Sequence, residues 1–171
     1  MIAGMALIRV CVSAILVSVP CSGGGSELDQ DFMNRLIPRI HDIVFRDEQH
    51  WRDNAYQVEI PTTRMCNLGL AVGGTGKLAV NGEEYELRRG CFYHISPPRS
   101  RMRFISDRDN PLLYIAVHFD YRLVHWEGTE LASKEADTAI PLPHVLQLEA
   151  EADAEEQFRK LYSLWNGKQP G

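Results

Sequence analysis

The sequence predicts a mainly β domain, a sandwich or barrel, followed by one C-terminal α-helix. The first observation is a series of short alternating or β-branched runs, separated by turn residues at intervals of about ten from Ile40 onward. The second is the pair Asn81-Gly82 between two such runs, which predicts a type I′ hairpin because both central residues of that turn need a positive φ. The third is a change to helical periodicity near the C-terminus.

The predicted strands follow one another without an internal repeat. They lie near residues 40–46, 56–60, 65–72, 76–80, 83–88, 91–95, 102–106, 112–120 and 140–148. Strands 76–80 and 83–88 flank Asn81-Gly82 and are expected to pair antiparallel. With 44% hydrophobic and 24% charged residues the composition is that of an ordinary globular protein. We expect the β domain to occupy residues 33–150.

The final segment, residues 151–171, is expected to hold an amphipathic helix from about residue 153 to residue 166. An Asp153-x-x-Glu156 capping box opens it, and Gly167 is expected to end it in the left-handed conformation. Its apolar stripe must pack against the barrel wall or against a partner helix, and the chain is interpreted as cut short after it. The candidate dimerisation residues on this stripe are Phe158, Leu161, Tyr162 and Trp165.

Residues 1–32 are interpreted as lying outside the folded domain. The apolar run 7–19 contains Arg9 and is shorter than the roughly 20 residues of a bilayer-spanning helix. We interpret the segment as an upstream, disordered over-extension of the reading frame before Met33. An export signal is the alternative, although no A-x-A cleavage motif is present. Under the preferred interpretation the protein is cytoplasmic and makes no membrane contact.

The charge and the cysteines argue against two classes of function. A net charge of −5 does not suit binding of a polyanion by the surface as a whole, so contact with DNA would need another segment. The four cysteines form no CxxC pair and no Cys/His cluster with zinc-ligand spacing, so no structural metal is indicated. Cys66 and Cys91 are interpreted as buried free thiols, and a disulfide between them is the open alternative.

Three motifs stand in a suggestive order along the chain. Residues 74–90, GTGKLAVNGEEYELRRG, combine a glycine turn, a hairpin and a glycine that opens the next strand. Pro97-Pro98 and the strand LYIAVHF at 113–119 follow. Together they resemble the cupin (double-stranded β-helix) sensor domain of AraC-type transcription regulators. The resemblance covers residues 36 to 166 and implies a small-molecule effector, a homodimer, and DNA binding only through a C-terminal helix-turn-helix domain that this sequence lacks.

The resemblance also bears on metals and catalysis. Metal-binding cupins resemble one another in an H-x-H and Glu on an early strand and a later His. Here the early strand 65–70 has no histidine, and Arg101, which stays protonated, occupies the later position. We therefore expect a barrel without metal or cofactor. No nucleophile with a base at useful spacing is found, so no catalytic residue is predicted and a binding protein is favoured over an enzyme.

Ligand contacts follow from the same resemblance. Similarity to the sugar-binding members places them at Arg64, Arg103, Tyr114 and Ala116, to which strand alternation adds Arg101 and His118. An arginine offers five donors in a fixed fork and an aromatic ring offers a stacking face, which suits a small sugar, polyol or sugar acid.

Alternatives to this interpretation stay open. The arginines, with Arg99 and Arg108, are equally consistent with a solvated charged rim. The function favoured is a ligand-sensing and dimerising module of a transcription regulator. A freestanding small cupin enzyme that acts on a sugar or small acid is the alternative, and an exported carbohydrate-binding module is a third.

Overall fold

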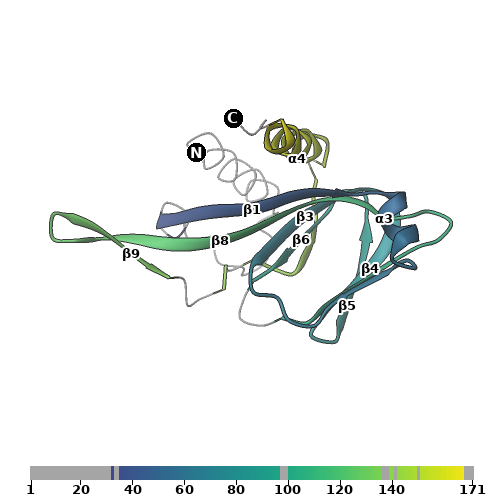
Figure 1. Cartoon of the computed structure of the whole chain (residues 1–171), viewed down its shortest axis with the longest axis horizontal. Coiled ribbons are helices and arrows are strands. Elements are labelled where there is room, and N and C mark those ends of the chain that lie inside the picture. The colour runs from purple at the N-terminus through teal and green to yellow at the C-terminus, as the bar shows by residue number, and fades with distance from the viewer. Residues whose placement is uncertain are drawn as a thin grey trace.

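The computed structural model describes residues 32, 35–96, 100–135, 139–140, 142–149 and 151–167. Two antiparallel sheets pack face to face, and a C-terminal helix covers the outer side of the larger sheet (Figure 1). The mainly β prediction with a C-terminal helix is confirmed, and the arrangement is that of a cupin jelly roll. The expectations for the over-extended or signal-like N-terminus lie outside the described residues, as do Pro97, Pro98 and Arg99.

The larger sheet, which we call sheet A, carries most of the long-range pairing. Its strands run in the order β1-β8-β3-β6-β10, and β9 pairs with the distal half of β8. Their bounds are β1 Leu36–Arg46, β3 Cys66–Gly73, β6 Cys91–Ile95, β8 Leu113–Glu127, β9 Glu130–Glu135 and β10 Val145–Gln147.

The smaller sheet, sheet B, has the strand order β2-β7-β4-β5. Its strands are β2 Gln57–Ile60, β4 Thr75–Val80, β5 Glu83–Arg88 and β7 Met102–Ser106. The predicted hairpin joins β4 and β5 in antiparallel register, with φ of 52° at Asn81 and 94° at Gly82. The two positive φ angles confirm the turn chemistry that the sequence predicted.

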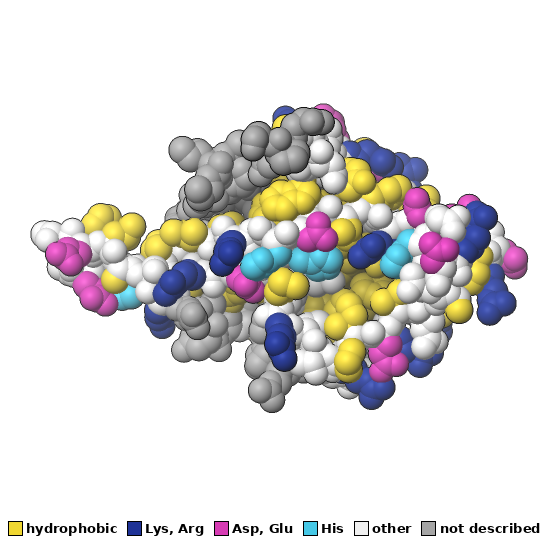
Figure 2. All heavy atoms as spheres, viewed as in Figure 1, with side chains coloured by type: hydrophobic (Ala, Val, Ile, Leu, Met, Phe, Trp, Pro, Cys, Tyr) yellow, Lys and Arg dark blue, Asp and Glu magenta, His cyan; other side chains and the backbone are white. Residues whose placement is uncertain are grey.

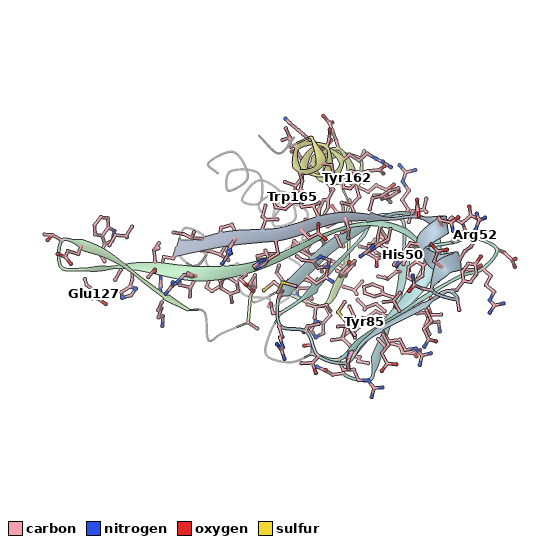
Figure 3. The ribbon with its side chains drawn as sticks, in the orientation of Figure 1. His50, Arg52, Tyr85, Glu127, Tyr162 and Trp165 are labelled. Atoms are coloured by element: carbon pink, nitrogen blue, oxygen red, sulfur yellow. The ribbon has the colours of Figure 1, made fainter. Side chains whose placement is uncertain are left out.

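Two elements were not predicted. The short helix α3 spans Glu48–Asp53 and is capped by Asp47, whose side chain accepts a hydrogen bond from the His50 N–H at 3.0 Å. It seats the fully buried Trp51. The other is a hairpin in which β8 continues past residue 120 and turns into β9. This hairpin projects from the body of the molecule, with Glu127 near its tip (Figures 1 and 3).

Helix α4, Glu151–Asn166, packs its apolar stripe on the barrel wall. Phe158 and Leu161 are buried against sheet A, and the Tyr162 ring meets Phe45 edge-on at 6.2 Å between centroids. Tyr162 and Trp165 border the same core, so the stripe has a partner within the chain (Figure 3). A role of these residues in dimerisation stays a prediction.

The helix ends differ from the sequence expectation. The helix begins two residues before the Asp153 capping box. The left-handed ending predicted at Gly167 is wrong, because Gly167 is not among the glycines with a positive φ. Its N–H donates to the Ser163 carbonyl at 2.9 Å, so the last turn closes with an ordinary helical hydrogen bond and needs no left-handed residue.

Sheet A separates two hydrophobic cores. The outer core lies between sheet A and α4, and the inner core lies between the two sheets. Cys66 belongs to the outer core and Cys91 to the inner core, and both are free thiols, as favoured from the sequence. Within the described ranges, no helix has the length and apolar character needed to cross a membrane.

Candidate ligand-binding site

The inward face of sheet A is organised in rows that cross neighbouring strands. The register aligns Val44, Ala116, Gly69 and Tyr93 across β1, β8, β3 and β6. Side chains alternate between the two faces along a strand, so the rows that point the same way as this one lie two residues before and two residues after it, about 7 Å away. The row therefore marks the middle of the space between the sheets.

This central row is built to leave room for one aromatic side chain. An ideal Cβ on Gly69 would lie 2.3 Å from Cζ and 2.5 Å from the hydroxyl oxygen of Tyr93. The Tyr93 side chain thus lies flat over the bare backbone of β3, which only a glycine allows. Ala116 beside it adds only a methyl group, so this part of the wall is shallow.

Four aromatic rings gather beyond the row. Tyr114 stacks on Phe104 with centroids 5.3 Å apart and an interplanar angle of 11°. Tyr93 meets both rings edge-on, at 5.9 Å from Tyr114 and 5.3 Å from Phe104. Trp51 closes the cluster 6.0 Å from Tyr114, and its indole N–H donates to the Leu112 carbonyl. The cluster forms a rigid apolar floor with two phenol hydroxyl groups.

Polar side chains form the opposite end. Asp42, His118 and Asn67 are neighbours across β1, β8 and β3. Asn67 is 6% exposed and Tyr93 is fully buried, yet within the described part of the chain neither Asn67 Oδ1 nor the Tyr93 hydroxyl has a hydrogen-bond partner. A buried polar group without a partner costs about 1–3 kcal/mol, so two of them on the same inward face suit a bound molecule.

Arg46 brings a positive charge to this interior. It is the cross-strand neighbour of Tyr114, and its charge lies close enough to the Tyr114 hydroxyl to lower the pKa of that group. Burial raises the pKa of Tyr114 to about 12, and Arg46 partly offsets this shift. Burial likewise raises the pKa of Tyr93 well above its ordinary value. Both hydroxyl groups therefore keep their protons near neutral pH and can donate hydrogen bonds.

His118 is held in its neutral form. Burial is the largest cause that lowers its pKa, and the charges of Arg46 and His41 act in the same direction, whereas Asp42 acts against it. A neutral imidazole has one donor and one acceptor nitrogen, which suits a hydroxyl group.

The site is hollowed on the surface. Figure 2 shows hydrophobic side chains recessed between the layer of β1 and β8 and the layer of β4 and β5. Histidine and lysine or arginine side chains border the recess on the β1 side. Access to the inner face is therefore from the edge where β1 lies.

The structure brings half of the predicted contact residues together. Tyr114, Ala116 and His118 all lie on the inward face of β8. The remaining three do not join them. Arg64 and Arg103 are exposed, and Arg101 is exposed and donates from Nε to Glu59 Oε1 at 2.8 Å. Contact of these three arginines with a ligand stays a prediction, and the charged-rim interpretation fits their positions better.

Sequence reasoning missed the residues that complete this face: Arg46, Asn67 and Tyr93. Arg46 is the last residue of β1, and a charged residue at the end of a strand gives no indication in the sequence that it borders the interior. The available signal lay on β3, where Asn67, Gly69 and Ala71 alternate with Cys66, Leu68 and Leu70. Small or polar residues on one face of a buried strand indicate that this face is not filled by its own side chains.

A second polar cluster lies on the outer face of sheet A. His94 Nε2 is 2.7 Å from Ser96 Oγ, which also accepts the Ile140 N–H at 3.3 Å. Burial is the main cause that lowers the pKa of His94 to about 4, and His144 adds to the shift. A neutral His94 that holds Ser96 and Ile140 is a structural feature of the outer face.

No metal centre is seen among the described residues, in which no three His, Cys, Asp or Glu side chains gather closely enough to hold an ion. The expectation of a metal-free barrel is not tested by this observation and stays a prediction.

Comparison with known proteins bears on the chain from α3 onward and leaves out β1. A search of curated proteins found no match. The family model described as the AraC-like ligand binding domain matches residues 49–169, which is more than half of the 171-residue chain. The match spans β2 to β8, the hairpin and α4. This chain belongs to the family of AraC-like ligand-binding domains.

Proposed function

We propose that this protein is the effector-sensing and dimerising module of a transcription regulator, and that it binds a small sugar, polyol or sugar acid between its two sheets without a metal. The observation that carries the proposal is that two buried polar atoms on the inward face, Asn67 Oδ1 and the Tyr93 hydroxyl, have no hydrogen-bond partner among the described residues, and that Tyr93 belongs to the aromatic floor. Hydroxyl groups of a ligand would satisfy both atoms, and its carbon skeleton would contact the rings.

The mechanism is a shift between two populations. A ligand that binds one arrangement of the sensor and its attached segments more tightly than another shifts the equilibrium toward the first. The module contacts DNA only through another domain, because its own net charge is −5. We place the regulator in the cytoplasm and infer that it acts by binding rather than by catalysis.

Homodimerisation belongs to the same proposal. Phe158 and Leu161 are committed to the chain's own core, so a partner subunit would use the rest of the helix surface, where Leu164 is 52% exposed. Light scattering on the purified chain is expected to give twice the mass of 19.4 kDa. A monomer at all accessible concentrations would contradict this part of the proposal.

Thermal unfolding with a panel of sugars, polyols and sugar acids tests binding. A ligand at about 100 times its dissociation constant adds about 2.7 kcal/mol of stability. Ala116→Leu, which fills the shallow wall, should abolish the shift, whereas Ala79→Leu on the outward face of β4 makes the same change outside the site and should preserve it. If both variants respond like the unmodified protein, the site is elsewhere.

Elemental analysis separates the proposal from the enzyme alternative. We expect less than one equivalent of any transition metal in the purified protein and no effect of a chelator on binding. A stoichiometric metal that is needed for binding would favour a small cupin enzyme instead.

A further inference from the structure

The arginines of this protein differ in whether they have a carboxylate partner. On the surface, Arg52, Arg89, Arg101 and Arg159 each form an ion pair with a glutamate. Arg46 is half-buried and borders the interior, and in the part of the chain that the structure describes it forms no ion pair. A half-buried charge without a counterion is unfavourable, so this position favours an anion.

Among the residues that the structure describes, the neighbours of Arg46 leave most of its donors unused. The Tyr114 hydroxyl is the polar group that faces the guanidinium across β1 and β8. A guanidinium has five N–H donors in a planar fork, and a carboxylate accepts two of them in parallel. The Tyr93 hydroxyl keeps its proton and has no partner in the described part of the chain, so it adds a donor that a carboxylate oxygen would also accept.

The end of the interior at Asn67 suits a hydrogen-bond donor and not a carboxylate. Asn67 Oδ1 can only accept, so its partner must be an O–H or N–H donor. Asn67 and His118 lie in one row. Arg46 and Tyr114 lie in another row, four residues along the strands. The row that contains Ala116 and Gly69 lies between these two rows. The Cα atoms of these outer rows are about 14 Å apart, and the long Arg46 side chain shortens this distance to the span of a small molecule.

We propose that the effector is a small hydroxylated carboxylic acid, with its carboxylate on Arg46 and the Tyr93 hydroxyl and its own hydroxyl groups on Asn67 and His118. The inference rests on the proposed function and narrows it from sugars and polyols in general to their acids. Tyr93 and Asn67 are buried, and each has a polar atom without a hydrogen-bond partner among the described residues. A neutral polyol would leave Arg46 without a counterion.

Matched pairs of compounds test the charge requirement. Isothermal titration calorimetry would compare D-galacturonate with D-galactose, and D-gluconate with D-sorbitol, on the full chain. The acid of at least one pair is expected to bind at least about tenfold more tightly than its neutral partner, as a charge-assisted pair requires.

Two variants assign this preference to its residues. Arg46→Met keeps the length of the side chain and removes the charge, so the acid should lose at least about tenfold in affinity while the neutral compound is unaffected. Tyr93→Phe removes only a hydroxyl without a partner, should not impair folding, and should weaken acid binding. Arg39→Met, an exposed arginine on the same strand, is the matched control and should bind as the unmodified protein does.

The outcomes separate the two levels of the proposal. Neutral compounds that bind as tightly as their acids, or an acid preference that survives both Arg46→Met and Tyr93→Phe, would overturn the inference and leave the proposed function standing. Failure of all four compounds to bind at millimolar concentration would count against both.

Discussion

The two faces of sheet A follow different rules although they share every strand. On β3, Cys66, Leu68, Leu70 and Val72 face α4, whereas Asn67, Gly69 and Ala71 face sheet B. The outer face is filled by its own side chains and closed by a helix. On β3 the inner face carries small and polar residues in place of large aliphatic ones. The difference indicates that the outer face provides stability and the inner face provides space and hydrogen-bonding groups.

This separation has an energetic reason. Each buried polar atom without a partner costs about 1–3 kcal/mol, and a domain of this size has only about 5–15 kcal/mol of net stability. A close-packed outer core offsets that cost, because burial of a large apolar side chain contributes about 1.5–3 kcal/mol. The binding face can then remain incompletely satisfied in the absence of a ligand.

The largest effect is expected at the centre of the outer core. Phe158→Ala should lower the free energy of unfolding by about 3–5 kcal/mol in denaturant titrations, because it leaves a cavity between α4 and sheet A. Leu164→Ala, on the exposed side of the same helix, should change it by less than about 0.5 kcal/mol. Equal losses in the two variants would show that α4 does not seal the outer face.

The next effect concerns the polar exception on the outer face. The pKa of His94 is lowered by burial to about 4, whereas an unfolded imidazole titrates near 6.5. Between these values the unfolded chain binds more protons than the folded one, so stability should fall as the pH is lowered from 6.5 toward 4. The full difference corresponds to about 3 kcal/mol at most.

His94→Gln should reduce this slope, since glutamine can still hydrogen-bond Ser96 but does not ionise. Part of the slope should remain, because burial also lowers the pKa of His118 and of His50. Chemical denaturation at several pH values would measure it, with His125→Gln on the projecting hairpin as the control. A slope that His94→Gln leaves unchanged would contradict the buried, neutral imidazole.

A smaller loss of stability is expected on the inner face. Gly69→Ala adds a methyl group where the Tyr93 ring now lies, 2.3 Å from its Cζ, and should lower stability by about 1–3 kcal/mol. It should also weaken ligand binding, because Tyr93 must move. Gly73→Ala on the same strand meets only a flexible Leu113 methyl at 3.1 Å and is the matched control. Ligand affinity that survives Gly69→Ala would argue against a site lined by Tyr93.

The sequence was sufficient for the fold because the fold depends on local signals. A few consecutive residues were enough to predict the Asn81-Gly82 turn, the alternating strands and the apolar stripe of α4. The short helix α3 was not predicted, because six residues are too few to show a helical period. The continuation of β8 was missed although Tyr121 and Leu123 alternate as buried residues, and β9 was missed because its described side chains are mostly exposed and give no apolar pattern.

The site was only partly predictable because it is assembled across strands. Tyr114, Ala116 and His118 follow from alternation on one strand. Their meeting with Arg46, Asn67 and Tyr93 depends on the strand order β1-β8-β3-β6, which no local pattern states. The sequence also could not tell which arginine faces the interior, since alternation gives two faces but not which of them is inward.

The smallest effect is expected for the arginines that the resemblance placed in the site. Arg103 is exposed on β7, and Arg101, directly before this strand, is paired with Glu59 in an exposed ion pair worth about 0–1 kcal/mol. Arg101→Met and Arg103→Met should therefore change the affinity for D-galacturonate by less than about twofold in calorimetry. Arg46→Met, measured beside them, should change it far more. If instead Arg103→Met abolishes binding, the ligand contacts the outer side of sheet B, and the contrast between the two faces of sheet A has no bearing on recognition.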